Sequence, residues 1–121
     1  MITGIDVVFI HTPHSELGAW YAEVLGLPRG YGDSHWQEFS LQGGSRFALD
    51  FTTYPRSPVE KQAIMISFKV EDIHAAVKDL AGKGVRFYPD GENTVFDAGP
   101  SLVATFQDPD GNWVQLSQRK G

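Results

Sequence analysis

The sequence contains no cysteine, no long hydrophobic run and no cluster of positive charge. Without cysteine, the chain cannot form disulfides, use a thiolate nucleophile or hold a metal through thiolate sulfur. Its apolar stretches are much shorter than the roughly 20 residues that cross a membrane. The ten basic residues are scattered and the formal net charge is −5, so we expect neither nucleic acid nor a membrane as a partner.

The first fourteen residues lack the basic stretch and the cleavage site of a secretory signal, so we predict a cytoplasmic location. A chain of 121 residues has the length of one compact domain. We predict a single domain over residues 1–121. It consists of a first module at 1–53, a proline-containing linker at 54–62 and a second module at 63–121.

The first module is predicted to run strand, helix and three strands. Residues Ile5–Thr12 are rich in β-branched and aromatic side chains and end at a proline, which predicts a strand. We expect Thr12 to cap the following helix, with Pro13 at its first position and Gly26 at its end. The other predicted strands are a weaker one at 27–31 and two at 36–41 and 46–52, joined by a glycine hairpin at 42–45.

The second module repeats this order, which indicates a weak internal symmetry. A strand is predicted at Ala63–Val70 and a helix at Asp72–Ala81, ended by a Gly-Lys-Gly segment. Further strands are predicted at 85–88, 94–97, 102–107 and 112–117. The segment Asp108-Pro109-Asp110-Gly111-Asn112 predicts a tight turn, in which Asp108 binds the turn amides and Gly111 adopts a positive φ.

Alternation along the strands separates two sets of side chains. The apolar set should pack beneath the helices: Val7, Phe9, Phe47, Leu49, Phe51, Ile64, Ile66, Phe68, Val70, Leu102, Ala104, Phe106, Val114 and Leu116. The mixed set combines acids, hydroxyls, a lysine and tryptophans: Asp6, Val8, Ile10, Trp36, Glu38, Ser40, Ala48, Asp50, Thr52, Met65, Ser67, Lys69, Val103, Thr105, Gln107, Trp113, Gln115 and Ser117.

The mixed set suits a ligand surface, where apolar walls give affinity and a few polar groups fix orientation. The alternative is that its tryptophans are buried at a dimer interface, since interfaces are also enriched in aromatic residues. The predicted fold is α+β, with two tandem βαβββ modules whose curved mixed sheets surround a cavity.

Several motifs resemble, in their order and spacing, those of the vicinal oxygen chelate superfamily. This superfamily includes glyoxalases, bleomycin resistance proteins and extradiol dioxygenases. The motifs are Trp20-Tyr21-Ala22-Glu23-Val24-Leu25-Gly26-Leu27, Trp36-Gln37-Glu38-Phe39, Phe47-Ala48-Leu49-Asp50, Val70-Glu71-Asp72 and Asp108-Pro109-Asp110-Gly111-Asn112. The resemblance covers essentially the whole chain, and it implies a small-molecule ligand and a homodimer.

The resemblance also implies where a metal would be bound in metal-dependent members. The four ligand positions fall, by motif, on Asp6, Asp50, Met65 and Gln115 of this sequence. A thioether is a poor ligand for a hard or borderline divalent ion, and Asp reaches less far than Glu, so we predict no metal cofactor. The alternative is a divalent metal held weakly by Asp6, Asp50 and Gln115 together with waters.

The histidines do not supply a metal site in their place, because no pair has the chelating spacing of a zinc motif. Alternation assigns His11 to the helix-packed side of its strand, and His14 and His74 fall in the first turns of the two predicted helices. His35, next to Trp36, is the one histidine that we keep as an acid–base candidate.

Three functions fit these patterns, and we favour a protein that sequesters a small molecule without a metal, as bleomycin-resistance-type proteins do. The predicted ligand contacts are Asp6, Trp36, Glu38, Asp50, Met65, Lys69, Trp113 and Gln115. The acids would attract a cationic ligand and the tryptophans would stack on its flat parts. Lys69 or Arg86 would bind an anionic substituent.

The second function is that of a glyoxalase- or dioxygenase-like lyase or oxidoreductase. Its chemistry would be metal-assisted, or would use Asp6 and Asp50 as a close pair of carboxylates, one of which exchanges protons near neutral pH. The third is a purely structural or regulatory interaction module. A homodimer is compatible with all three functions.

Overall fold

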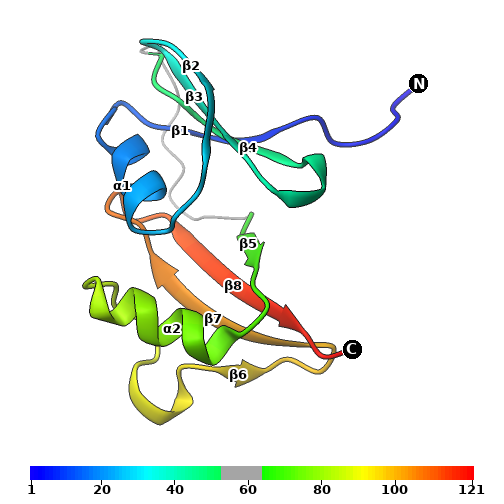
Figure 1. The fold of residues 1–121 in the computed structure, drawn as a ribbon, viewed down its shortest axis with the longest axis vertical. Helices are drawn as coiled ribbons and strands as arrows, with labels where there is room; N and C mark the ends of the chain where they lie inside the picture. Colours follow the sequence, from blue (N-terminus) through cyan, green and yellow to red (C-terminus); the bar gives the residue numbers. More distant parts are fainter. Residues whose placement is uncertain (53–63) are drawn as a thin grey trace. The chain divides into compact units, whose positions relative to one another are not determined.

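The computed structural model describes residues 1–52 and 64–121. The chain divides into two compact units, Met1–Ser57 and Pro58–Gly121, and each contains one four-stranded mixed sheet and one main helix (Figure 1). The predicted α+β class with two βαβββ modules is therefore confirmed. The whole predicted linker lies outside the described residues, and the assignment of both modules to one domain stays a prediction.

The first unit contains a sheet with the strand order β1-β4-β3-β2. Its elements are β1 (Val8–His11), α1 (Leu17–Glu23), β2 (Arg29–Gly32), β3 (Trp36–Ser40), a short 3₁₀ turn η1 (Gln42–Gly44) and β4 (Arg46–Asp50). β1 runs parallel to β4, whereas β4 with β3 and β3 with β2 are antiparallel. Strand β4 therefore lies between β1, near the beginning of the chain, and β3.

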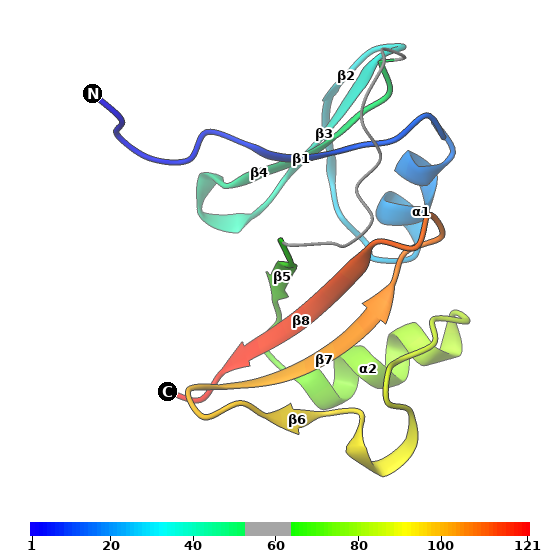
Figure 2. The same cartoon turned by 180° about the vertical axis from the view of Figure 1, so that it is seen from behind.

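The second unit has the same arrangement, with the order β5-β8-β7-β6 and β5 parallel to β8 (Figure 2). Its elements are β5 (Ile66–Lys69), α2 (Ile73–Gly82), a short 3₁₀ turn η2 (Gly91–Asn93), β6 (Phe96–Asp97), β7 (Ser101–Gln107) and β8 (Trp113–Arg119). The internal symmetry is confirmed. No helix in residues 1–52 or 64–121 is long and apolar enough to cross a membrane.

The predicted strand at 85–88 is wrong. The amide of Val85 donates to the carbonyl of Leu80 and so belongs to the end of α2. An isolated bridge and a ring contact join Phe87 to Phe106, and the amide of Tyr88 donates to the carbonyl of Thr105, but these residues do not form a regular strand.

The predicted start of α1 is also wrong, because the helix begins at Leu17 and not at Pro13. The amide of Thr12 donates to the carbonyl of Asp50, so Thr12 continues the pairing of β1 with β4. Its hydroxyl accepts from the amide of His14 at 3.1 Å, which makes a turn before the helix. In α2, by contrast, Asp72 caps the helix by accepting from the amide of Ala75 at 3.1 Å.

One face of each sheet packs against the helix of its own unit. In the first unit, the ring of Tyr21 in α1 lies 6.3 Å from that of Phe39 and 5.1 Å from that of Phe47, and all three are buried. In the second unit, α2 packs on β7 and β8 and buries Ile73 and Leu80. These contacts exclude water from the apolar side of each sheet.

The predicted apolar side of β4, β7 and β8 is buried at Phe47, Leu49, Ala104, Phe106, Val114 and Leu116 and half-buried at Leu102. In β4 the other side is buried as well, at Ala48 and Asp50. For β1 the prediction is wrong by one residue. Val8 pairs with Phe47, so Val8 shares the helix side, whereas Phe9 and His11 face the other way. Because apolar residues occupy both parities of this strand, alternation alone does not determine which face of β1 is buried.

The turn between β7 and β8 is as predicted. Asp108 is buried, and its Oδ1 accepts from the amides of Asp110 and Asn112 at 2.9 Å each. Its Oδ2 accepts from the side-chain amide of Asn112 at 2.8 Å, and Gly111 has a φ of 86°. One carboxylate therefore satisfies three donors of the turn.

We expect Asp108→Ala to lower the free energy of unfolding by about 2–3 kcal/mol, because it leaves partly buried donors without their acceptor. Asp108→Asn is the matched control, since it keeps one oxygen but places an NH₂ group against the Asn112 side chain. It should cost about 1 kcal/mol. Urea unfolding of the three proteins measures both values, and equal stability of Asp108→Ala and wild type would contradict this account of the turn.

Candidate functional site

The sheet face opposite α1 carries most of the site residues predicted for the first unit, and we call it the first open face. Because paired residues of neighbouring strands point to the same side, its side chains form three rows across β1, β4 and β3. The rows are His11, Asp50 and Trp36; then Phe9, Ala48 and Glu38; then Arg46 with Ser40.

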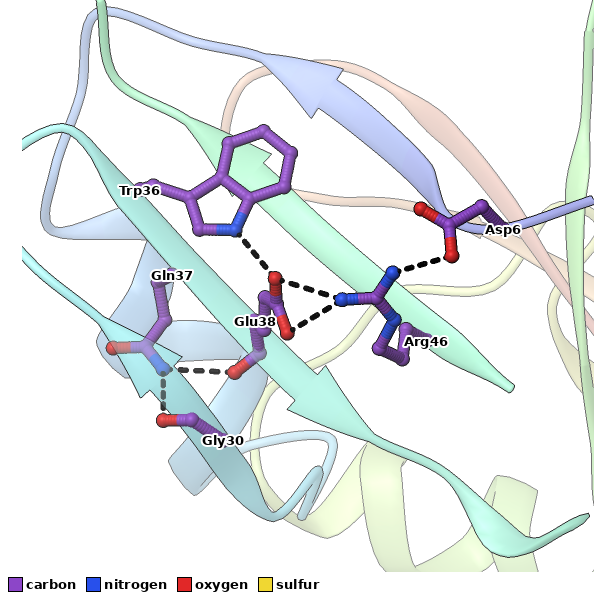
Figure 3. Close-up of polar contacts among 6 residues, drawn as sticks. All are labelled: Asp6, Gly30, Trp36, Gln37, Glu38 and Arg46. Carbon is purple, nitrogen blue, oxygen red and sulfur yellow. Dashed lines mark hydrogen bonds and ion pairs between the residues drawn. The ribbon is translucent and has the colours of Figure 1, made fainter. Parts of the chain in front are cut away.

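Glu38 is the centre of a polar network on this face (Figure 3). Its Oε2 accepts from the indole Nε1 of Trp36 at 3.0 Å, and Nη1 of Arg46 lies 3.1 Å from both carboxylate oxygens. Nη2 of Arg46 donates to Oδ1 of Asp6 at 2.6 Å. The network therefore joins three predicted site residues, and it does so through Arg46, which the sequence analysis missed.

The network determines the charge carried by the first open face. Its hydrogen bonds, first that with Asp6 and then that with Glu38, raise the pKa of Arg46 above its ordinary value, so the guanidinium stays charged. Two carboxylates and one guanidinium leave a single net negative charge. The expectation that free acids attract a cation is weakened here, because Asp6 and Glu38 already bind Arg46.

The loop before β3 positions Trp36. Asp33 accepts from the amide of His35 at 2.8 Å and from the hydroxyl of Tyr31 at 3.1 Å, while its own amide donates to the carbonyl of Trp36. The His35 amide first, and then the Tyr31 hydroxyl, lower the pKa of Asp33, and the same hydroxyl contact raises the pKa of Tyr31. The exposed ring of His35 lies in this loop, with Nδ1 3.1 Å from Oγ of Ser34.

Glycine allows β2 to approach β3 closely at this edge. An added Cβ on Gly30 would lie 2.9 Å from Oγ of Ser40 and 3.7 Å from Cβ of Glu38. The side-chain amide of Gln37 bridges the same two strands, since it donates to the carbonyls of Glu38 at 2.8 Å and of Gly30 at 3.4 Å (Figure 3). Strand β2 and the side chain of Gln37 therefore hold the backbone of β3 at Glu38 on the side away from β4.

Asp50 lies at the other end of β4 from Arg46, where it pairs with Trp36 of the network. It is buried, and its Oδ1 accepts from the amide of Thr52 at 2.9 Å and from the Thr52 hydroxyl. Oδ2 of Asp50 lies 3.8 Å from Nδ1 of His11. The sequence analysis places His11 on the helix side of β1. Because that assignment is wrong by one residue, it does not predict that His11 is a neighbour of Asp50.

The structure does not bring Asp6 and Asp50 together. Asp6 binds Arg46, the first residue of β4, whereas Asp50 is the last residue of that strand. Four residues of extended chain separate the two positions by roughly 13 Å. These carboxylates therefore do not form the close pair on which the acid–base hypothesis depended.

The second open face lies opposite α2 in the second unit. Its rows across β5, β8 and β7 are Lys69, Ser117 and Val103; then Ser67, Gln115 and Thr105; then Trp113 with Gln107. The hydroxyl of Ser67 donates to Oε1 of Gln115 at 3.0 Å. Met65 precedes β5 and is exposed.

In the second unit, Trp113 makes a ring contact with Tyr88, and Arg86 makes a cation–π contact with Tyr88. The ring of Trp113 meets the ring of Tyr88 edge-on at 5.1 Å, and the guanidinium of Arg86 lies 5.1 Å above the ring of Tyr88. Tyr88 falls in the segment for which the sequence predicts a regular strand, and no pattern in the sequence indicates its contact with Trp113. A cation over an aromatic face is a favourable contact that fixes both groups.

The four positions expected for a metal do not fit a divalent cation. Asp6 is bound to Arg46, Asp50 accepts from the amide and hydroxyl of Thr52, Gln115 accepts from Ser67, and Met65 offers only a thioether. Within residues 1–52 and 64–121, no three His, Asp or Glu side chains are grouped so that they could hold a metal ion. The donors at these positions therefore do not suit a hard or borderline divalent ion.

Comparison with known proteins gives a family match. The model of the Glyoxalase/Bleomycin resistance protein/Dioxygenase superfamily matches residues 15–116. No curated protein sequence matches this chain.

Solved structures also resemble this chain. One is a glyoxalase family protein from Bacillus anthracis, with a TM-score of 0.75, 20% identity and coverage of 99% of this chain and 98% of that one. Another is TnmS3, an antibiotic binding protein from Streptomyces sp. CB03234, with a TM-score of 0.71, 22% identity and coverage of 99% and 100%. A glyoxalase/dioxygenase from Nostoc punctiforme has a TM-score of 0.72, 14% identity and coverage of 98% and 92%. Likenesses of this identity show the fold alone.

We expect Glu38→Ala to change the indole N–H resonance of Trp36, because the substitution removes the acceptor of that proton. Nitrogen-15 heteronuclear NMR measures this directly, since the chain has only three tryptophans. The signals of Trp20 and Trp113 serve as internal controls and should stay in place. A Trp36 signal that does not move would show that its indole does not bind Glu38.

Proposed function

The chain belongs to the Glyoxalase/Bleomycin resistance protein/Dioxygenase superfamily, and we propose that it binds a flat organic compound without a metal. The observation that carries this proposal is the network in which Glu38 holds both Trp36 and Arg46 on the first open face. Aromatic surface beside a few fixed polar groups is the usual composition of a small-molecule site.

Trp36 and Phe9 supply the aromatic surface in the first unit. Their ring centroids lie 5.2 Å apart at an interplanar angle of 59°, and Phe9 is 45% exposed. The bond from the indole to Glu38 fixes the plane of Trp36 before a ligand arrives. A ring that is already oriented loses less conformational freedom on binding, which favours affinity.

The predicted contacts of the second unit fit the same proposal. Trp113 is oriented by Tyr88, and Gln115 is oriented by Ser67. Lys69 is exposed on the same face of the sheet as Gln115. We propose that these residues, together with Met65, contact ligand in their unit, and that Trp36, Glu38 and Asp50 do so in the first, where Asp6 is the partner of Arg46.

The likeness to an antibiotic binding protein supports sequestration, in which the compound is bound and not transformed. The alternative is a lyase or oxidoreductase, and the closeness of His11 to Asp50 favours a metal-free acid–base version of it. A catalyst of that kind would change its ligand chemically, which product analysis detects. A homodimer and a cytoplasmic location stay predictions from the sequence.

The test is binding of a panel of uncharged naphthalene and quinoline derivatives, measured by calorimetry with and without a chelator. We expect Trp36→Ala to weaken binding about tenfold, the effect of losing roughly 1.4 kcal/mol of ring contact. Trp20→Phe, which changes a tryptophan of α1, is the matched control and should leave binding unchanged. The chelator should have no effect.

Two results would contradict the proposal. The first is a failure of every compound of the panel to bind. The second is binding that is lost with the chelator and restored by a divalent metal, which would move the function to metal-dependent chemistry.

A further inference from the structure

Arg46 has two carboxylate partners that are held very differently. Glu38 lies in β3 with 17% of its side chain exposed, and it also accepts from Trp36. Asp6 is 83% exposed and lies before β1, outside any helix or strand. Nη1 of the guanidinium is therefore bound to the sheet, while Nη2 is bound to an exposed residue of the N-terminal segment (Figure 3).

The Asp6 contact is the one that a ligand can replace. An exposed ion pair is weak, because water screens both charges and the side chains lose freedom when they pair. Glu38 keeps Arg46 in place when Asp6 leaves, since both of its oxygens contact Nη1. Nη1 consequently keeps its partner when Asp6 leaves, and Nη2 becomes available to a ligand.

We propose that Asp6 occupies the place of a ligand carboxylate, and that Nη2 of Arg46 binds the carboxylate of an aromatic acid in its stead. This inference rests on the proposed function and names the class of ligand. The planar N–H groups of arginine suit a carboxylate, and such charge-assisted hydrogen bonds are stronger than neutral ones.

The neighbouring rings are at the right spacing for the rest of such a ligand. Arg46 lies two residues before Ala48 on the same face of β4, and Ala48 pairs with Phe9 on one side and Glu38 on the other. Residues two apart on a strand are separated by roughly 6–7 Å. A carboxylate at Arg46 therefore places a fused aromatic ring beside Phe9 and Trp36.

Charge balance favours an acid over an amine. When a ligand carboxylate takes the place of Asp6, Arg46 still has two carboxylate partners, and the displaced Asp6 carboxylate is hydrated at the surface. A cationic ligand would instead have to compete with Arg46 for Glu38 and Asp6. This reverses the sequence-based expectation of a cationic ligand.

The test compares three probes with the same ring system: 2-naphthoate, neutral 2-naphthylmethanol and cationic 2-naphthylmethylamine. We expect the wild-type protein to bind the naphthoate most tightly. Asp6→Ala removes the competing carboxylate and should tighten naphthoate binding about three- to tenfold while leaving the alcohol unchanged. The substitution lies on the surface and does not endanger the fold.

Asp79→Ala is the matched control, because Asp79 is also an exposed acid paired with a cation, Lys83, at 3.4 Å, and lies in the second unit. It changes the net charge equally and should leave all three affinities unchanged. Arg46→Gln should remove the preference for the naphthoate over the alcohol.

The outcomes separate this inference from the proposed function. If the alcohol binds but the naphthoate binds no better, or if Asp6→Ala fails to tighten naphthoate binding specifically, the inference is overturned and the proposed function stands. If none of the three probes binds and the uncharged panel also fails, the proposed function falls together with the inference.

Discussion

The packing of Tyr21 against Phe39 and Phe47 decides which way the side chains of the first sheet face. Burial of these rings fixes one side of β3 and β4 toward α1, and the period of two in a strand then turns Glu38 and Arg46 to the other side. The packing of the core therefore determines that Glu38 and Arg46 lie on the same face and can form the polar network. The second unit follows the same rule, with α2 in place of α1.

What distinguishes the first open face is that its charges are already paired. Arg46 lies between Glu38 and Asp6, and the indole N–H of Trp36 also donates to Glu38. A partly buried carboxylate needs such partners, because burial without hydrogen bonds is costly. A ligand can therefore contact the aromatic rings of Phe9 and Trp36, and it can replace Asp6 in the ion pair with Arg46.

The fold could be predicted from the sequence because its signals are local. Two βαβββ modules follow from periodicity and glycine punctuation, and the turn at Asp108 follows from its residue types. The errors arose where local patterns are ambiguous. In β1, apolar residues occupy both odd and even positions, so alternation did not determine which face is buried. Thr12 pairs with Asp50 in the sheet, so α1 begins later than its sequence predicts.

The site was predicted less completely, for a physical reason. Alternation placed Trp36 and Glu38 on one face, but Arg46 and Asp6 are 40 residues apart, and only the parallel pairing of β1 with β4 brings them together. His11 was missed because its face depended on the same register. Contacts between distant segments depend on tertiary packing, which no window of sequence records.

The most direct test of the open faces as binding surfaces is fluorine NMR of protein labelled with 5-fluorotryptophan during titration with 2-naphthoate. The three tryptophans report on three places: Trp20 on α1, and Trp36 and Trp113 on the two open faces. The account predicts that the Trp36 signal shifts with saturation while the Trp20 signal stays in place. A shift confined to Trp20 would contradict it, because binding would then occur on the helix side.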